Sequence, residues 1–179
     1  IFTKFAFDAV VKIDLENRTD SRGMFSRLFC MDEFEKNGLN TAWKQINRST
    51  SYKIGTVRGL HFQRKPMMEI KLVRCVRGAI FDVIVDLRNG SKTYGAWTSI
   101  MLNDQNNSMI YIPEGFAHGF QTLESDSELL YMHSETYSPD LEGGVYFNDP
   151  DLSIPWPITP QVVSCKDKTL PRLNEIVPL

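Results

Sequence analysis

Short runs of apolar residues, separated by polar turns, recur along most of this chain. Val, Ile, Phe and Tyr dominate these runs, which lie at 70–88, 95–102, 108–113, 117–123 and 127–137. Turn-forming residues separate them at 77–78, 89–91, 104–107 and 113–115. Many short strands at fairly even spacing are typical of an all-β sandwich or barrel. We therefore predict an all-β fold.

Helix is predicted at few places. The pattern at residues 31–39 predicts a short helix that ends at Gly38. The tail after Pro155 contains further prolines, so we expect it to be irregular with one helical turn. A chain of 179 residues can bury one sizeable core. Because no internal repeat or linker is visible, we predict a single domain over residues 1–179.

Composition and charge exclude several classes of partner. Hydrophobic residues make up 42% of the chain and the net charge is -2, so no basic field favours nucleic acid. Cys30, Cys75 and Cys165 form no CxxC pair, which predicts reduced thiols and a cytoplasmic location. The N-terminal apolar stretch contains Lys4 and Asp8, unlike a secretory signal. No apolar run is long enough to span a bilayer, so no membrane partner is expected.

His61 lies in the segment VRGLHFQ, between two apolar neighbours. Alternate residues of a strand point to one side, so we expect Gly59, His61 and Gln63 to share a face. The ordinary interpretation is a strand histidine with satisfied hydrogen bonds. The alternative is a general base. A lysine, a tyrosine and an aspartate elsewhere would complete a set suited to removing a proton next to a carbonyl.

Lys71 and Tyr131 are the candidate lysine and tyrosine of this set. Lys71 lies in EIKLVR, where Glu69, Lys71 and Val73 are expected to share a face. It is either a solvated rim residue or a lysine buried opposite an anion. Tyr131 lies in a strand-like run and is either a packed aromatic with its hydroxyl at the rim or an acid.

Three more polar residues each have two interpretations. Asp167 lies between two lysines, so spacing alone favours a solvated surface carboxylate over a partner for a base. Tyr137 precedes a Ser-Pro pair and either anchors a loop or stacks on a flat ligand. His118 lies close to Gly115 and Gly119 after a turn and either lines a ligand site or bonds to a neighbouring strand.

The remaining histidines and arginines bear on metal and phosphate binding. A metal site in a β-barrel usually needs two or three clustered histidines and a carboxylate. His61, His118 and His133 are not clustered in the sequence, so we predict no metal site. Several arginines are candidates to bind a diphosphate through forked hydrogen bonds, and composition does not distinguish among them. These are Arg22, Arg58, Arg64, Arg74 and Arg77.

Taken together and in order, these segments resemble the dTDP-4-dehydrorhamnose 3,5-epimerase family, a branch of the cupin jelly rolls. The resemblance runs from DSRGMF at 20–25 to SCKDK at 164–168. It also includes QINRS, VRGLHFQ, EIKLVRCVRGAIFDVIVDLR, YIPEGFAHGF, LLYMHSETYSP and NDPDLSIPWP. One such segment alone would be a weak signal, but the ordered set is specific.

The resemblance implies a cupin jelly-roll barrel with a few short helices, mainly C-terminal. It implies a homodimer that uses no metal and no organic cofactor. The substrate would be a nucleotide-linked 4-keto-6-deoxyhexose, such as dTDP-4-keto-6-deoxyglucose, inverted at C3 or at C3 and C5 through an enolate. Such chemistry serves deoxysugar pathways.

Residue roles also follow from the resemblance. His61 would be the base, Asp167 its partner, Lys71 the stabiliser of the C4 enolate, and Tyr131 the acid on the opposite face. The expected substrate-binding residues are Gln45 and Asn47 in the cleft, Arg58 at the diphosphate, His118 at the sugar, Tyr137 as a stacking ring and Arg22 reaching into the partner's site.

The chain departs from the family pattern in two places. Family members usually carry arginines and a tryptophan where this chain has Gly143, Tyr146 and Phe147, and an acidic residue near the position of Arg27. These changes bear on the nucleobase and the sugar more than on the reaction class. Alternative functions are a 3-epimerase, a keto-isomerase, a non-catalytic carbohydrate-binding jelly roll and a metal-dependent cupin oxygenase.

Overall fold

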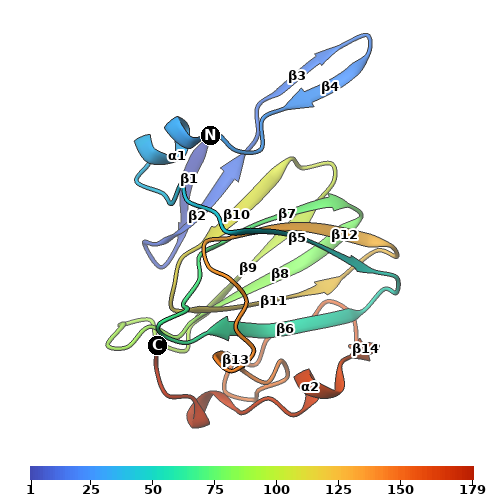
Figure 1. Ribbon diagram of the computed structural model, residues 1–179. Helices are drawn as coiled ribbons and strands as arrows, with labels where there is room; N and C mark the ends of the chain where they lie inside the picture. The colour runs from blue at the N-terminus through green and yellow to red at the C-terminus, as the bar shows by residue number, and fades with distance from the viewer.

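The computed structural model describes residues 1–179 as two six-stranded sheets that face each other, with a separate two-stranded ribbon (Figure 1). The first sheet has the order β1 (Phe2–Ala6), β2 (Val10–Asp14), β10 (Ser108–Ile112), β7 (Lys71–Arg77), β12 (Ser127–His133) and β5 (Gln45–Ser51). The second has β13 (Glu142–Gly144), β6 (Thr56–Gln63), β11 (Phe116–Thr122), β8 (Ala79–Asp86) and β9 (Trp97–Asn103), while the short β14 (Val162–Val163) pairs with β6. The predicted all-β jelly roll is confirmed, as two facing sheets without closure into a ring.

The predicted turns lie between consecutive strands. Gly78 alone separates β7 from β8, with a positive φ of 75° that suits glycine. Residues 89–91 lie between β8 and β9, residues 104–107 connect β9 to β10, and residues 113–115 connect β10 to β11. The turn-forming residues of the sequence therefore mark where these strands begin and end.

Both faces of the second sheet are covered. In β8, Ile80 and Ile84 face the core between the two sheets, whereas Val83 and Val85 belong to a second apolar cluster. That second cluster contains Leu152 and other residues of the C-terminal segment, which runs along the outside of β6 in Figure 1. Strands buried on both faces read as nearly continuous apolar runs, as the segment 79–86 does apart from Asp82 and Asp86.

Helices are few and short, as predicted. The first, α1 (Met31–Lys36), is shorter than the sequence pattern suggested, because a turn with Gly38 at φ 68° follows Lys36. The C-terminal segment contains α2 (Cys165–Lys168) and one 3₁₀ turn, Leu173–Glu175. No helix of the structure has the length and apolar character needed to cross a membrane. The cysteines are unpaired, as predicted.

The ribbon of β3 (Asn17–Asp20) and β4 (Gly23–Ser26) projects from the body of the molecule in Figure 1. It carries apolar side chains in solvent, with Met24 54% and Phe25 64% exposed. Large exposed apolar side chains gathered on a projecting ribbon are typical of an interaction surface.

Candidate active site

A cavity of about 560 Å³ is lined by strands of both sheets and by the C-terminal segment. The first sheet contributes side chains from β5, β7 and β12, and the second contributes β6, β11 and β13. Every site residue that the resemblance implies lines this cavity except Arg22, and the further candidate arginines Arg64, Arg74 and Arg77 lie outside it. The fold therefore gathers residues that lie far apart in the sequence.

His61 and Asp167 form a hydrogen-bonded pair at this cavity. Nε2 of His61 lies 2.7 Å from Oδ1 of Asp167, whose side chain is only 5% exposed, while that of His61 is 30% exposed. Burial would raise the pKa of Asp167, but the hydrogen bond and charge of His61 outweigh it and hold this pKa below its ordinary value. When the His61 ring is neutral, Nε2–H donates a hydrogen bond to this carboxylate and Nδ1 carries the free lone pair.

The surface position that spacing favoured for Asp167 is wrong, for a reason found in the C-terminal segment. Strand β14 pairs in parallel with the start of β6, through Val162 opposite Thr56. This pairing carries α2 past the middle of β6. There the N-cap Ser164 accepts a hydrogen bond from the backbone of Asp167, and Oδ2 of Asp167 accepts one from Gly59 at 3.3 Å.

A bulge in β6 brings Arg58 and His61 to the same cavity. His61 lies opposite His118 of β11 and Arg58 lies opposite Phe120, so three steps along β6 match two along β11. Gly59 is at φ 118°, and a Cβ there would lie 2.6 Å from the Cα of the facing Gly119. The predicted common face assumed regular alternation, which this bulge interrupts.

Lys71 is buried rather than solvated at the rim. Its side chain is 9% exposed, and Nζ lies 3.1 Å from Oε1 of Glu69. It also donates to the backbone oxygen of His61 at 3.4 Å. As predicted, Glu69 and Lys71 share one face, since both line the cavity. A buried ammonium held beside the candidate base can stabilise negative charge that develops there.

Tyr131 faces the cavity from the sheet opposite to that of His61. Its ring packs against the core between the sheets and stacks on His133, with ring centroids 5.8 Å apart at 26°. Burial raises the pKa of Tyr131, so its hydroxyl stays protonated near neutral pH. The hydroxyl makes no hydrogen bond to another residue, which leaves it free to serve a ligand.

His118 both lines the cavity and bonds to a neighbouring strand, so its two interpretations hold together. Its Nε2 lies 2.7 Å from Oδ2 of Asp82 on β8, and both side chains are almost fully buried. Burial raises the pKa of Asp82, and its Oδ1 has no hydrogen-bond partner. Sequence reasoning missed Asp82, although its charge within the apolar run of β8 was a signal.

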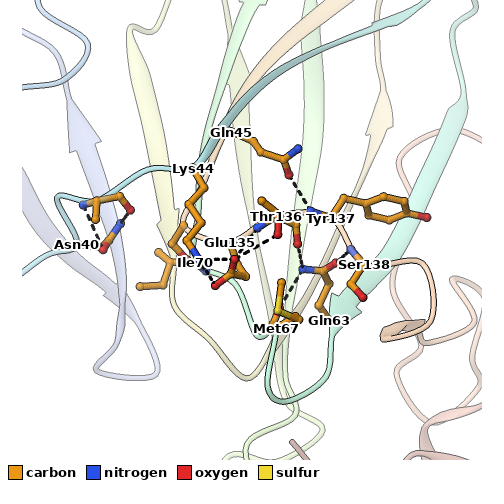
Figure 2. A network of polar contacts seen from close by, with 12 residues as sticks. Asn40, Lys44, Gln45, Gln63, Met67, Ile70, Glu135, Thr136, Tyr137 and Ser138 are labelled. Carbon is orange, nitrogen blue, oxygen red and sulfur yellow. Dashed lines mark hydrogen bonds and ion pairs between the residues drawn. The ribbon is translucent and has the colours of Figure 1, made fainter.

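Two glutamines hold the loop that carries Tyr137, as Figure 2 shows. Oε1 of Gln45 accepts from the backbone nitrogen of Tyr137 at 2.8 Å. Gln63 accepts from Ser138 at 2.6 Å and donates to the carbonyl oxygens of Thr136 and Met67. Gln63 does not line the cavity, so it supports this loop and does not face the ligand site.

Charged residues surround the exposed ring of Tyr137. Its hydroxyl donates to Oε2 of Glu142 at 2.7 Å, and Lys166 forms an ion pair with the same carboxylate. Arg58 donates to Oγ of Ser51 at 3.1 Å, and its side chain also lines the cavity. Sequence reasoning missed Glu142 and Lys166, because β13 and α2, which carry them, are too short to show a periodic pattern.

Arg22 lies outside the cavity, on the projecting ribbon, where it pairs with Asp20 at 2.6 Å. Within one chain it does not reach the site. The departures from the family pattern also lie outside the cavity lining. Arg27 pairs with Glu33 at 2.9 Å, and Gly143 accommodates the ring of Phe62, which a Cβ would approach to 2.6 Å.

No group of three or more His, Cys, Asp or Glu side chains is arranged to hold a metal ion. His133 is the remaining histidine at the cavity, and its Nδ1 lies 2.7 Å from Oε2 of Glu69. Its place two residues after Tyr131 on the same face was a signal that the sequence offered. The cavity therefore holds His61, His118 and His133, each with its own carboxylate.

The chain matches the family model of dTDP-4-dehydrorhamnose 3,5-epimerase over residues 4–175. It is 47% identical over 158 residues to a dTDP-4-dehydrorhamnose 3,5-epimerase of Sinorhizobium fredii, covering 88% of this chain and 81% of that protein. It is 42% identical over 169 residues to a dTDP-4-dehydrorhamnose 3-epimerase of Streptomyces niveus, covering 94% and 81%. A crystal structure of the Legionella pneumophila dTDP-6-deoxy-D-glucose-3,5-epimerase in complex with dTDP-4-keto-L-rhamnose is similar, with a TM-score of 0.93 and 35% identity over 99% of this chain and 94% of that one.

The fold and these matches define a cupin-type jelly-roll isomerase. The chain belongs to the dTDP-4-dehydrorhamnose 3,5-epimerase family. The resemblance seen in the sequence is thereby confirmed, and an enzyme is favoured over a non-catalytic carbohydrate-binding jelly roll.

Proposed function

We propose that this protein inverts C3, or C3 and C5, of a dTDP-linked 4-keto-6-deoxyhexose through an enolate. The observation that carries the proposal is the placement of two proton-transfer groups on opposite walls of one cavity. His61 lies on the second sheet and its partner Asp167 lies in the C-terminal segment. Tyr131 lies on the first sheet, across the cavity. Inversion at carbon needs a base on one face and an acid on the other, which these walls supply.

Different residues remove the proton from carbon and supply the new one. Nδ1 of His61 removes the proton from the carbon next to the C4 ketone, and Asp167 stabilises the imidazolium through Nε2. The electrons of the broken C–H bond form the enolate. The hydroxyl of Tyr131 then gives its proton to the opposite face of that carbon, which completes inversion. Solvent afterwards takes the proton from the imidazolium of His61 and reprotonates Tyr131.

Lys71 stabilises the charge that forms on the C4 oxygen. A positioned base contributes typically about 10²–10⁴-fold to such a reaction, so the acidity of the C–H bond must be raised by other means. An ammonium that is buried and already in place lowers the energy of the enolate, as an oxyanion hole does. The low exposure of Lys71 strengthens this effect, because little water screens it.

The remaining cavity residues are assigned to substrate binding. Arg58 and Lys166 supply positive charge for the diphosphate, and Arg58 is held in place by Ser51. Tyr137 offers an exposed ring for stacking near the sugar or nucleobase. The expected sugar contact is His118. In the same cleft, Gln45 and Asn47 line the cavity beside these groups.

Incubation with dTDP-4-keto-6-deoxyglucose in deuterated water tests this function. We expect deuterium at C3, or at C3 and C5, because the proton returned by the acid derives from solvent. NMR of the sugar nucleotide identifies the carbons that exchange and the product that forms. Absence of exchange at every carbon next to the ketone would contradict the proposal.

A 3-epimerase is the second candidate, because the Streptomyces niveus relative carries that name. The two candidates share the base, the acid and the enolate at C3. Deuterium at C3 without deuterium at C5 would identify the narrower activity in the same experiment.

We propose further that the protein is a two-fold dimer in which Arg22 reaches the partner's cavity. The apolar side chains on the β3–β4 ribbon and the distance of Arg22 from its own cavity support this arrangement. We expect light scattering at micromolar concentration to give twice the mass of one chain. Arg22→Ala should raise KM more than it lowers kcat. A fully active monomer would contradict the dimer.

A further inference from the structure

One buried carboxylate connects Lys71 to a histidine that the proton-transfer scheme does not use. Oε1 of Glu69 lies 3.1 Å from Nζ of Lys71, and Oε2 lies 2.7 Å from Nδ1 of His133. The three side chains are between 9% and 15% exposed, and all line the cavity. Each oxygen of Glu69 therefore has a separate partner.

Strand pairing sets this arrangement. His133 lies directly opposite Lys71 in the antiparallel pair of β12 and β7, and Glu69 is two residues before Lys71 on the same side. The pairing continues past the end of β7, because Ile70 donates to Oγ of Ser134 at 2.7 Å and accepts from its backbone at 3.0 Å. Figure 2 shows Ile70 beside this loop. The hydrogen bonds between Ile70 and Ser134 thus hold together the two segments that carry Glu69 and His133.

The contacts keep Glu69 ionised. Burial would raise its pKa, but the hydrogen bond from His133 and the charge of Lys71 outweigh burial and hold the pKa below its ordinary value. An ionised carboxylate inside a cavity is stable only when such partners satisfy it. Glu69 is therefore an anion held in place, and it forms an ion pair with the ammonium of Lys71.

The same contacts restrict Lys71. A lysine ammonium has three N–H donors on a flexible stem. One contacts Glu69 and another the backbone oxygen of His61 at 3.4 Å, which leaves one for a ligand. His133 also stacks on Tyr131, so one ring contacts the acid directly and the lysine through Glu69.

We propose that Glu69 and His133 are positioning residues, which hold the ammonium of Lys71 at the C4 oxygen and brace the ring of Tyr131. This inference rests on the proposed function. A donor held in place before the enolate forms needs no reorganisation as charge develops, and a displacement of about 1 Å can cost about 10²-fold in rate. Removing the support should therefore slow the reaction without removing the reacting groups.

The test compares Glu69→Ala and Glu69→Gln with wild type, measuring C3 exchange and inversion. We expect Glu69→Ala to lower kcat about 10- to 100-fold while KM changes less than about threefold. Glu69→Gln keeps an oxygen acceptor for Lys71, so it should recover most of this loss. Asp14→Ala removes an ion pair of 2.8 Å outside the cavity and serves as the control with unchanged activity.

Two variants of His133 separate its contacts. His133→Phe keeps a ring beside Tyr131 but donates nothing to Glu69, so exchange and inversion should fall together. His133→Ala removes the ring as well, so inversion should fall further than exchange. These variants keep the inference testable if Glu69→Ala does not fold.

Wild-type activity in Glu69→Ala, or an equal loss in Glu69→Ala and Glu69→Gln, would overturn the positioning role, because position would not be the factor lost. An unchanged ratio of inversion to exchange in His133→Ala would overturn the bracing of Tyr131. Absence of exchange in the wild-type protein is a different result. It would overturn the proposed function and this inference with it, whereas the other outcomes concern the positioning residues alone.

Discussion

His61→Ala is expected to abolish deuterium exchange at C3, with a loss of about 10²–10⁴-fold or more. Nδ1 of His61 is the free ring nitrogen at the cavity, and no other histidine there pairs with Asp167. The measurement is the rate of deuterium incorporation by NMR, with circular dichroism to verify folding. Retained exchange at C3 in the folded variant would exclude His61 as the base.

His61→Asn is a matched second variant. Its amide can still donate to Asp167, so the buried carboxylate keeps a partner and the fold keeps its stability. It has no basic nitrogen, so exchange should be lost as in His61→Ala. Asp167→Asn should cost less than either, because it misorients the base without removing it. Activity equal to wild type in Asp167→Asn would contradict the orienting role.

Tyr131→Phe is expected to separate proton removal from inversion. The variant should still exchange deuterium at C3, because His61 and Lys71 remain, but it should form about 10²–10⁴-fold less inverted product. The enolate would persist or be reprotonated from its original face. Only the hydroxyl is lost, so the packing of the ring against the core and His133 should survive.

Measuring exchange and inversion on one sample of this variant distinguishes three cases. Exchange without inversion supports Tyr131 as the acid. Epimerisation near the wild-type rate would mean that Tyr131 only packs in the core. Loss of both would mean that the hydroxyl holds the substrate or stabilises the enolate. Tyr137→Phe, which removes the hydroxyl bound to Glu142, is the comparison at a tyrosine outside the core.

The all-β class and the positions of many strands and turns could be predicted from the sequence, because both depend on local signals, whereas the order of the strands in each sheet depends on distant pairings. Turn residues such as Gly78 mark the strand ends, and the apolar runs mark the strands. Alternation also placed Glu69 and Lys71 together on one face, as the cavity confirms. The helix after Met31 was predicted too long, because the weak local preference of the last residues gave way to a turn at Gly38.

The geometry of the site depends on long-range contacts, which the local sequence does not specify. Residue types marked His61, Lys71 and Tyr131 as candidates, and the resemblance to the epimerase family then assigned their roles. Only the tertiary structure decided that Asp167, 106 residues after His61, is buried against it. Spacing between two lysines indicated the surface, and the pairing of β14 with β6 overruled it. The bulge at Gly59 likewise depends on close contact with Gly119, which no local pattern encodes.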